Sequence, residues 1–312
     1  MKRLKTVFMG TPEFAVPCLR RLIEISDVAG VVTQPDKKRG RGQKLSSSPV
    51  KAFAQQSNLA VFQPERIRDE EFMSQLKSLS PELIVVVAFG QILPQHILEL
   101  PLFGCINVHA SLLPRYRGAA PMQRCLMAGE TLTGVTTMFM DAGLDTGDIL
   151  LNEKVEIDAD TTLEMLHDTL SEIGANLLEK TLTALIDGTL VRTPQDDSVS
   201  SYAAMLTKDT GKMDWNKSAV ELHNLVRALN SWPGAYSFFD GKLFKIWRTR
   251  VVSSDCGGRP GEVVQLTEQG ILVATGNNGL LEILELQAPG KKRMSAKDFL
   301  MGHIIPEHSF FA

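Results

Sequence analysis

Short apolar runs alternate with helix-like patterns along the first half of the chain. The runs are rich in Val and Ile and almost free of polar residues, as strands covered on both faces of a sheet require. Between the first two runs, Pro12 precedes apolar residues at helical spacing from Phe14 to Ile23. This order predicts an α/β fold with a doubly wound, mostly parallel sheet, whose ligands bind at the carboxyl ends of the strands. The strands are expected at residues 4–9, 28–33, 83–87, 105–108 and 135–140.

The pattern changes twice in the second half. Apolar residues recur every three or four positions from Leu163 until Gly188, which predicts a long amphipathic helix at the end of the first domain. The next stretch is polar and has no period, so it is interpreted as a linker. Beyond it, the capping pattern Ser218-x-x-Glu221 predicts a helix, and short apolar runs predict a small, OB-like β-barrel. The barrel strands are expected at 236–239, 243–251, 261–266, 271–274 and 280–286.

The length of 312 residues agrees with two domains. They are expected at 1–189 and 208–312, with the linker at 190–207. Hydrophobic residues are 44% and charged residues 22%, which is typical of a globular protein and excludes a disordered chain. The longest apolar run has seven residues, at 83–89, whereas a membrane span needs about 20. The basic N-terminus is not followed by a signal-peptide core, and no cysteines are paired in sequence, so a cytoplasmic protein with reduced thiols is expected.

Two polar residues come at the end of the strand expected at 105–108. Asn107 and His109 are two positions apart, so on an extended strand their side chains point to the same face. An acidic segment, 141–148, follows the next strand and is expected along the same rim, where Asp145 would orient His109. The alternative is that Asn107 and His109 are only turn and capping residues.

An amide, an imidazole and a carboxylate suit acyl transfer without a nucleophilic side chain. When an amine attacks an acyl carbon, the carbonyl oxygen becomes an oxyanion, to which Asn107 can donate a hydrogen bond. His109, held by Asp145, can accept the proton that the amine loses. These three residues are therefore the predicted catalytic set.

Other kinds of site find little support. Position 143 is Gly and no Glu stands twelfth in the acidic segment, so it does not match a calcium loop. Paired His and Cys spacings for zinc are absent, and no metal is expected. The glycine pattern of dinucleotide sites is also missing, and Gly10 is best interpreted as part of a tight strand-to-helix turn.

A basic segment stands out from the acidic net charge of −3. Residues 37–44 hold five cations, and no acid occurs between Asp36 and Glu65. Such a local patch attracts a polyanion where the overall charge cannot, and Gly40 and Gly42 would keep it mobile. The alternative is a solvated surface loop. As a nucleic-acid contact, the segment offers Lys37, Lys38, Arg39, Arg41 and Lys44.

The chain resembles the folate-dependent formyltransferases in three segments, which read FGQILP at 89–94, NVHASLLPRYRG at 107–118 and GLDTG at 143–147. The Asn, His and Asp of that family match Asn107, His109 and Asp145. The basic segment, with DW at 214–215, WPGA at 232–235 and GKKRM at 290–294, resembles the members that formylate methionyl-tRNA. This likeness extends over nearly the whole chain.

The resemblance implies 10-formyltetrahydrofolate as formyl donor and initiator methionyl-tRNA as acceptor, with a C-terminal barrel that helps to hold the tRNA. It also implies a folate site formed by three parts of the chain. These are the segment 89–94 after the third strand, the acidic segment 141–148 and part of the second motif, 107–118. Nothing in the pattern demands a subunit interface, so a monomer is expected. The implied folate-binding residues are Gly90, Gln91, Ile92, Leu93, Ser111, Leu112, Leu113, Pro114 and Asp141.

Two alternatives remain at this point. One is a folate-dependent enzyme of the same family whose acceptor is a UDP-amino sugar. The other is an RNA-binding regulator that retains a degenerate transferase fold, against which the intact set of Asn107, His109 and Asp145 argues.

Overall fold

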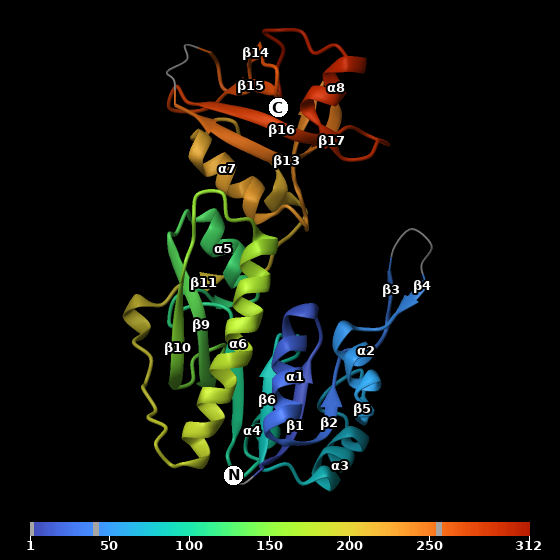
Figure 1. Ribbon diagram of the computed structural model, residues 1–312, viewed down its shortest axis with the longest axis vertical. Helices are drawn as coiled ribbons and strands as arrows, with labels where there is room; N and C mark the ends of the chain where they lie inside the picture. The colour runs from blue at the N-terminus through green and yellow to red at the C-terminus, as the bar shows by residue number, and fades with distance from the viewer. Residues whose placement is uncertain (1–2, 40–43, 254–257) are drawn as a thin grey trace. The chain divides into compact units, whose positions relative to one another are not determined.

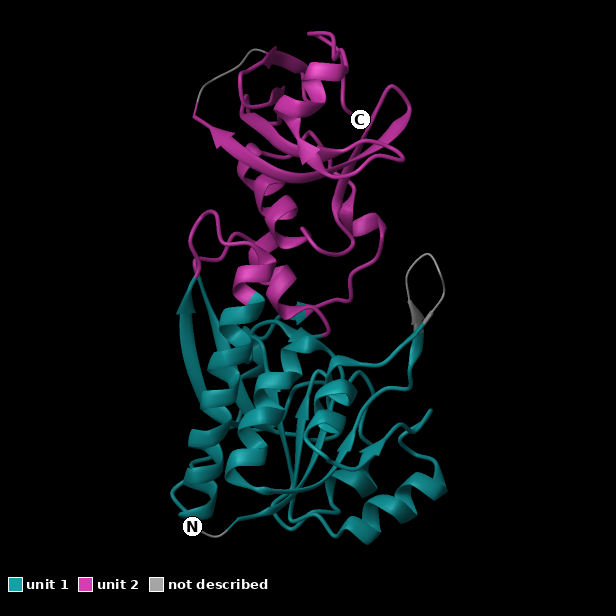
Figure 2. Ribbon diagram, turned by 45° about the vertical axis from the view of Figure 1, so that its right-hand side comes forward, with its two compact units in different colours: residues 1–118, 132–156, 167–202 teal, residues 119–131, 157–166, 203–312 magenta. Residues whose placement is uncertain are grey.

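The computed structural model describes residues 3–39, 44–253 and 258–312 and divides the chain into two compact units (Figure 2). Neither unit is continuous in sequence, whereas both domains expected from the sequence are. Unit 1 comprises residues 1–118, 132–156 and 167–202, and unit 2 comprises residues 119–131, 157–166 and 203–312.

A seven-stranded sheet forms the centre of unit 1 (Figure 1). The five strands of this sheet that come first along the chain are parallel to one another, which confirms the mostly parallel α/β fold. The five strands expected from the sequence are all present. In spatial order the strands are β10 (Ile149–Glu156), β9 (Leu132–Phe139), β7 (Cys105–His109), β6 (Leu83–Val87), β1 (Lys5–Gly10), β2 (Asp27–Val32) and β5 (Val61–Phe62).

Helices cover both faces of this sheet. On one face, Gly174 of α6 (Leu163–Ile186) packs against Val108 of β7 and Cys18 of α1 (Val16–Ile25), after the short η1 (Glu13–Ala15). On the other face, α3 (Glu70–Leu79) and α4 (Gln95–Leu98) bury apolar residues against the alternate side chains of β1 and β6. The helix α2 (Pro49–Gln56) starts at Ser48, whose hydroxyl accepts the Lys51 main-chain N–H. The long helix expected after Leu163 is confirmed.

The strand β9 runs antiparallel to β7. Its last residue, Phe139, therefore lies opposite Ile106, near the start of β7, and the acidic segment 141–148 leaves from there. The expectation that this segment begins at the carboxyl edge of the sheet is wrong. It is the connection of a β9–β10 hairpin, and it reaches Asn107 from the opposite direction.

Unit 2 holds an antiparallel sheet in the order β12-β13-β16-β15-β14, with β17 paired to β16. The predicted capping box is present at Ser218 and Glu221, at the start of α7 (Ala219–Ala228). The strands of unit 2 are β12 (Ala235–Phe239), β13 (Lys242–Val252), β14 (Val263–Leu266), β15 (Ile271–Ala274), β16 (Leu280–Gln287) and β17 (Met294–Ser295). The helices of unit 2, besides α7, are α5 (Pro121–Met127), η3 (Asp209–Gly211) and α8 (Ala296–Gly302).

The last four residues of the chain connect the two edges of this sheet. Phe238 exchanges two main-chain hydrogen bonds with Ala312 on the β12 edge. On the β14 edge, the N–H of Val263 donates to Ser309 and the N–H of Phe311 donates to Gly261. Both edge strands of the sheet thus find a partner in residues 309–312.

Three cysteines, Cys18, Cys105 and Cys125, are buried, and Cys256 lies outside the described residues. Burial raises the pKa of the first two thiols to about 12. In the described part of the chain, no helix has both the length and the apolar character to cross a membrane.

Candidate functional site

Asn107 and His109 belong to β7 and share one of its faces, as the sequence predicts. Cys105, which stands on the same face of the strand, packs into the apolar cluster beneath α3 and α4. Asn107 is 8% exposed and His109 is 6% exposed. These polar side chains therefore need hydrogen-bond partners within the protein, and they find them in two loops.

Asp145 is one of these partners, and three groups bind it. The main-chain N–H of Gly118 donates to Oδ2 at 2.8 Å, and Nδ2 of Asn107 donates to Oδ1 at 3.4 Å. The main-chain carbonyl of Asp145 accepts a bond from Gln195 at 2.9 Å. Its backbone has a φ of 55°, in the left-handed region that Asp tolerates better than most residues. Asp145 thus adopts an unfavourable backbone conformation that its neighbours hold in place.

The two ring nitrogens of His109 each face an oxygen. Nε2 lies 3.0 Å from the main-chain carbonyl of Tyr116, which can only accept, so the hydrogen of the neutral ring is on Nε2. Nδ1 then has a lone pair and lies 3.7 Å from Oδ2 of Asp145, beyond hydrogen-bond distance. A proton added at Nδ1 would point to this carboxylate.

This arrangement combines a hydrogen-bond donor, a proton acceptor and a fixed negative charge. Asn107 has a second amide hydrogen besides the one on Asp145. His109 has an unprotonated nitrogen beside a carboxylate that would stabilise the added proton. The set requires neither a metal nor a covalent intermediate to serve acyl transfer.

Three contributors to the site escape prediction as functional residues. Tyr116 and Gly118 act through main-chain atoms, which sequence patterns do not distinguish. Gln195 lies in the stretch interpreted as a linker, yet its amide donates to the carbonyls of Asp145 and Gly147, at 2.9 Å and 2.7 Å. A polar residue in a polar stretch carries no signal that could have identified it.

The implied folate-binding residues lie in two environments. Gly90 has a φ of 84° with open space beside it, and Ile92 is 76% exposed, so this loop offers accessible surface after β6. Leu93, by contrast, is buried in the apolar core. Gln91 holds the loop by accepting the main-chain N–H of Ile67 at 2.9 Å.

The second motif and the acidic segment are tied by local hydrogen bonds. Ser111 donates to the carbonyl of Arg115 at 2.7 Å, and the Leu113–Pro114 peptide bond is cis. Leu112 approaches Gly134 of β9. Asp141 accepts bonds from Gly143 N–H and Thr146 Oγ1, at 3.0 Å and 2.6 Å, and so shapes the loop that carries Asp145.

Residues 37–39 and 44 of the basic segment lie on a separate two-stranded ribbon, β3 (Lys37–Arg39) paired with β4 (Lys44–Ser46) (Figure 1). Lys37 is exposed, and Arg41 lies outside the described residues. At the base, Lys51 Nζ donates to Asp36 at 2.6 Å, and this bond, with one from Gln63, keeps the pKa of Asp36 below its ordinary value.

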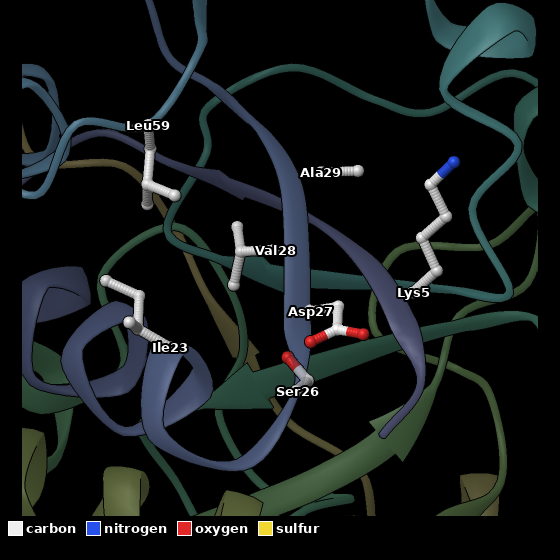
Figure 3. A pocket seen from close by; sticks show the side chains of 7 residues that line it. All are labelled: Lys5, Ile23, Ser26, Asp27, Val28, Ala29 and Leu59. Atoms are coloured by element: carbon white, nitrogen blue, oxygen red, sulfur yellow. The ribbon is translucent and has the colours of Figure 1, made fainter. Parts of the chain in front are cut away.

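A cavity of about 420 Å³ lies elsewhere in unit 1, at the edge where β1 and β2 begin (Figure 3). It is the amino edge of the parallel strands, whereas His109 stands at a carboxyl end. None of the predicted site residues that the structure describes lines this cavity. Among the described residues, no group of three or more His, Cys, Asp and Glu side chains is placed to hold a metal ion. The cavity is lined by Lys5, Ile23, Ser26, Asp27, Val28, Ala29 and Leu59.

Two family models match the chain. Residues 4–182 match the formyl transferase model, and residues 205–304 match the model of the formyl transferase C-terminal domain.

Curated relatives are similar over almost the full length. The methionyl-tRNA formyltransferase of Alkaliphilus oremlandii is 51% identical over 303 residues, which cover 97% of each chain. That of Geobacter sulfurreducens is 52% identical over 303 residues, covering 97% of this chain and 95% of the relative.

Solved structures share the fold at lower identity. WlaRD, a sugar 3N-formyl transferase crystallised with dTDP and 5-N-formyl-THF, has a TM-score of 0.68 and 20% identity, covering 94% of this chain and all of its own. At this identity the likeness carries the fold alone.

Proposed function

The chain belongs to the methionyl-tRNA formyltransferases, and on this basis we propose that it transfers the formyl group of 10-formyltetrahydrofolate to the α-amino group of methionine on initiator tRNA. The observation that carries the proposal is the convergence of Asn107, His109 and Asp145 at the end of β7. The resemblance to the family implies catalytic roles for the same three residues.

Asn107 stabilises the transition state in this proposal. The amine attacks the formyl carbon directly, and the formyl oxygen gains negative charge as the carbon becomes tetrahedral. The second N–H of Asn107 donates to this oxygen, while Asp145 accepts the first N–H and fixes the plane of the amide. Asn107 is already ordered before the charge develops, so no reorganisation is needed during the reaction.

His109 handles the proton. Because Nε2 carries its hydrogen to the Tyr116 carbonyl, Nδ1 is the nitrogen that accepts the proton of the attacking amine. The imidazolium then has a carboxylate beside it and adds positive charge near the oxyanion. As the bond between the formyl carbon and the folate nitrogen breaks, that nitrogen takes the proton from His109 and leaves as tetrahydrofolate, so the imidazole is neutral again.

The donor is assigned to the loops around this site. Gly90 and Ile92 are exposed, so this loop offers main-chain hydrogen-bonding groups and an apolar side chain to a flat, polar ring system. The segment 111–114 and Asp141 complete the proposed folate site. Bound there, the donor supplies an activated formyl group, and the protein supplies position, charge and the proton acceptor.

The tRNA is assigned to the basic ribbon and to unit 2. Lys37, Lys38, Arg39, Arg41 and Lys44 concentrate positive charge in one segment, which suits the phosphates of an acceptor stem. In unit 2 we infer a small, OB-like β-barrel, supported by residues 309–312 bonding to both edges of the sheet. We further propose a monomer at work in the cytoplasm, which light scattering and fractionation would test.

One assay separates this function from its rivals. A labelled formyl donor is offered in parallel to methionyl initiator tRNA, to a charged elongator tRNA and to a UDP-amino sugar. We expect label on the initiator tRNA alone. Label on the sugar, insensitive to ribonuclease, would identify a sugar formyltransferase. Failure to label any acceptor would favour the RNA-binding regulator.

A further inference from the structure

Gln195 bridges two segments of unit 1 that the proposed mechanism depends on. We propose that Gln195 is a positioning residue which, together with Arg117, holds the loop of Asp145 in its active conformation. The proposal deepens the proposed function and rests on it for the role of Asp145. Its geometric part, that Gln195 fixes Asp145, stands on the contacts alone.

Gln195 uses both ends of its side-chain amide. Nε2 donates to the carbonyls of Asp145 and Gly147, at 2.9 Å and 2.7 Å. Oε1 accepts from Nε and Nη2 of Arg117, at 3.0 Å and 2.8 Å. Since the guanidinium only donates and the carbonyls only accept, these partners fix which end of the amide is which.

Arg117 is itself anchored. Its Nη2 also donates to Asp197 at 2.8 Å, and its side chain is only 11% exposed. The next residue, Gly118, donates its main-chain N–H to the carboxylate of Asp145 at 2.8 Å. Two consecutive residues therefore hold Asp145. Gly118 binds the side-chain carboxylate of Asp145, and Arg117 acts by way of Gln195 on the main-chain carbonyl of Asp145.

The loop needs such a restraint. Asp145 has a left-handed backbone, which is costly for a residue with a Cβ unless the surroundings hold it. Within residues 191–200, Gln195 is the residue whose surface is not exposed. A polar side chain turned inward from an exposed stretch, with every polar atom bonded to the site, is expected of a positioning role.

The same stretch provides a matched control. Arg192 donates from Nε to Asp148 at 2.9 Å, so it ties the end of the same loop without contacting Asp145. If any link between these segments were sufficient, loss of Arg192 would matter as much as loss of Gln195.

The test compares Gln195→Met with Arg192→Met in the full-length protein. Amide hydrogen exchange at Gly118 reports directly on whether Asp145 still accepts its N–H. We expect exchange about tenfold faster in Gln195→Met, the equivalent of one lost hydrogen bond, and unchanged exchange in Arg192→Met. The kcat of formyl transfer should fall about tenfold in Gln195→Met, with both KM values kept, because the reacting groups are misplaced.

Gln195→Glu keeps an acceptor for Arg117 but loses the two donors, so it should resemble Gln195→Met. Wild-type protection of Gly118 in either Gln195 variant overturns the proposal. If Gln195→Met does not fold, Arg117→Lys replaces it. Lysine offers Gln195 one donor in place of two, so hydrogen exchange at the Gly118 amide should become faster, but by less than in Gln195→Met. Wild-type protection of this amide in Arg117→Lys also overturns the proposal. Should the wild-type enzyme formylate nothing, the exchange measurements still decide the geometric part.

Discussion

Oδ2 of Asp145 stands 3.7 Å from Nδ1 of His109, while the same oxygen is bound at 2.8 Å by the N–H of Gly118. The carboxylate is therefore held in place by the main-chain N–H of Gly118 and the side chain of Asn107, and not by the ring that it faces. It serves as a fixed charge that a proton on Nδ1 would meet, and the imidazole is oriented by the Tyr116 carbonyl at its other nitrogen.

Replacing Asn107 or His109 by Ala should lower kcat at least about a hundredfold, because each variant removes a group that acts in the transition state. Thermal unfolding should show that both variants fold. The control is His96→Ala, an exposed histidine of α4. Turnover close to wild type in the Asn107 or His109 variant would reject the role given to that residue.

Asp145→Asn should fold and yet lose about a hundredfold in kcat. Asn tolerates the left-handed backbone, and its carbonyl oxygen can still accept the N–H of Gly118, so the loop keeps its shape. What is lost is the negative charge beside His109. Steady-state kinetics, with circular dichroism to verify folding, measure this, and an unchanged kcat would show that the charge is not needed.

Sequence reasoning identified Asn107 and His109 through their spacing. Residues two positions apart face the same side of any strand, whatever the strand pairs with. The same reasoning misjudged the path to Asp145, because apolar runs mark a strand without giving its direction. The reversal of β9 depends on pairing between distant residues, Asn107 with Met138 for example, and no local pattern encodes that. The acidic loop nevertheless reaches the same site, from the other end of the sheet.

Lys37→Gln should raise the KM for tRNA and reduce the slope of log affinity against log salt by nearly one, as expected for one lost phosphate contact. Lys77→Gln, at an exposed position on α3, is the control for a change of net charge alone. Binding titrations at several salt concentrations measure both slopes. Equal slopes for wild type and Lys37→Gln would remove this lysine from the tRNA site.

Acid should weaken unit 2 through His223. Burial holds the pKa of this histidine below its ordinary value of 6.5, and Arg227 acts in the same direction, against Asp160 and the Ala159 carbonyl. Protonation therefore favours the unfolded chain, so stability is complete above pH 6.5 and falls as the pH drops toward the folded-state pKa. His223→Gln can replace both hydrogen bonds, to Ala159 and Thr249, without titrating. Chemical unfolding at pH 8 and pH 5 should show a smaller loss in this variant.

Phe311→Ala should destabilise unit 2 by about 3–5 kcal/mol, the usual cost of removing a buried aromatic ring. Phe311 is 2% exposed and contacts the rings of Trp215, Phe239 and Phe244. Its neighbour Phe310 is 37% exposed, so Phe310→Ala should cost much less. Urea unfolding of the two variants makes the comparison. Equal losses in the free energy of unfolding would mean that the buried ring of Phe311 stabilises unit 2 no more than the exposed ring of Phe310.

The strands and the capped helix of unit 2 were predictable from local patterns, since their turns carry clear signals. Asp240 and Gly241 both have positive φ, as a tight hairpin between paired strands requires. The role of residues 309–312 was not, because four residues at a terminus are too short for a periodic pattern. Gln195 is a similar case, since its importance lies in distant carbonyl groups.

The interleaved sequence of the two units limits how the gene can be divided. The backbone leaves unit 1 after residue 118, returns at 132, leaves again at 157 and returns at 167 before the final passage at 203. No single cut yields two fragments that each contain one whole unit and nothing else. A fragment ending at 189 would carry orphaned pieces of unit 2, and grafting the C-terminal portion onto another transferase would require exchanging the inserted stretches 119–131 and 157–166 as well.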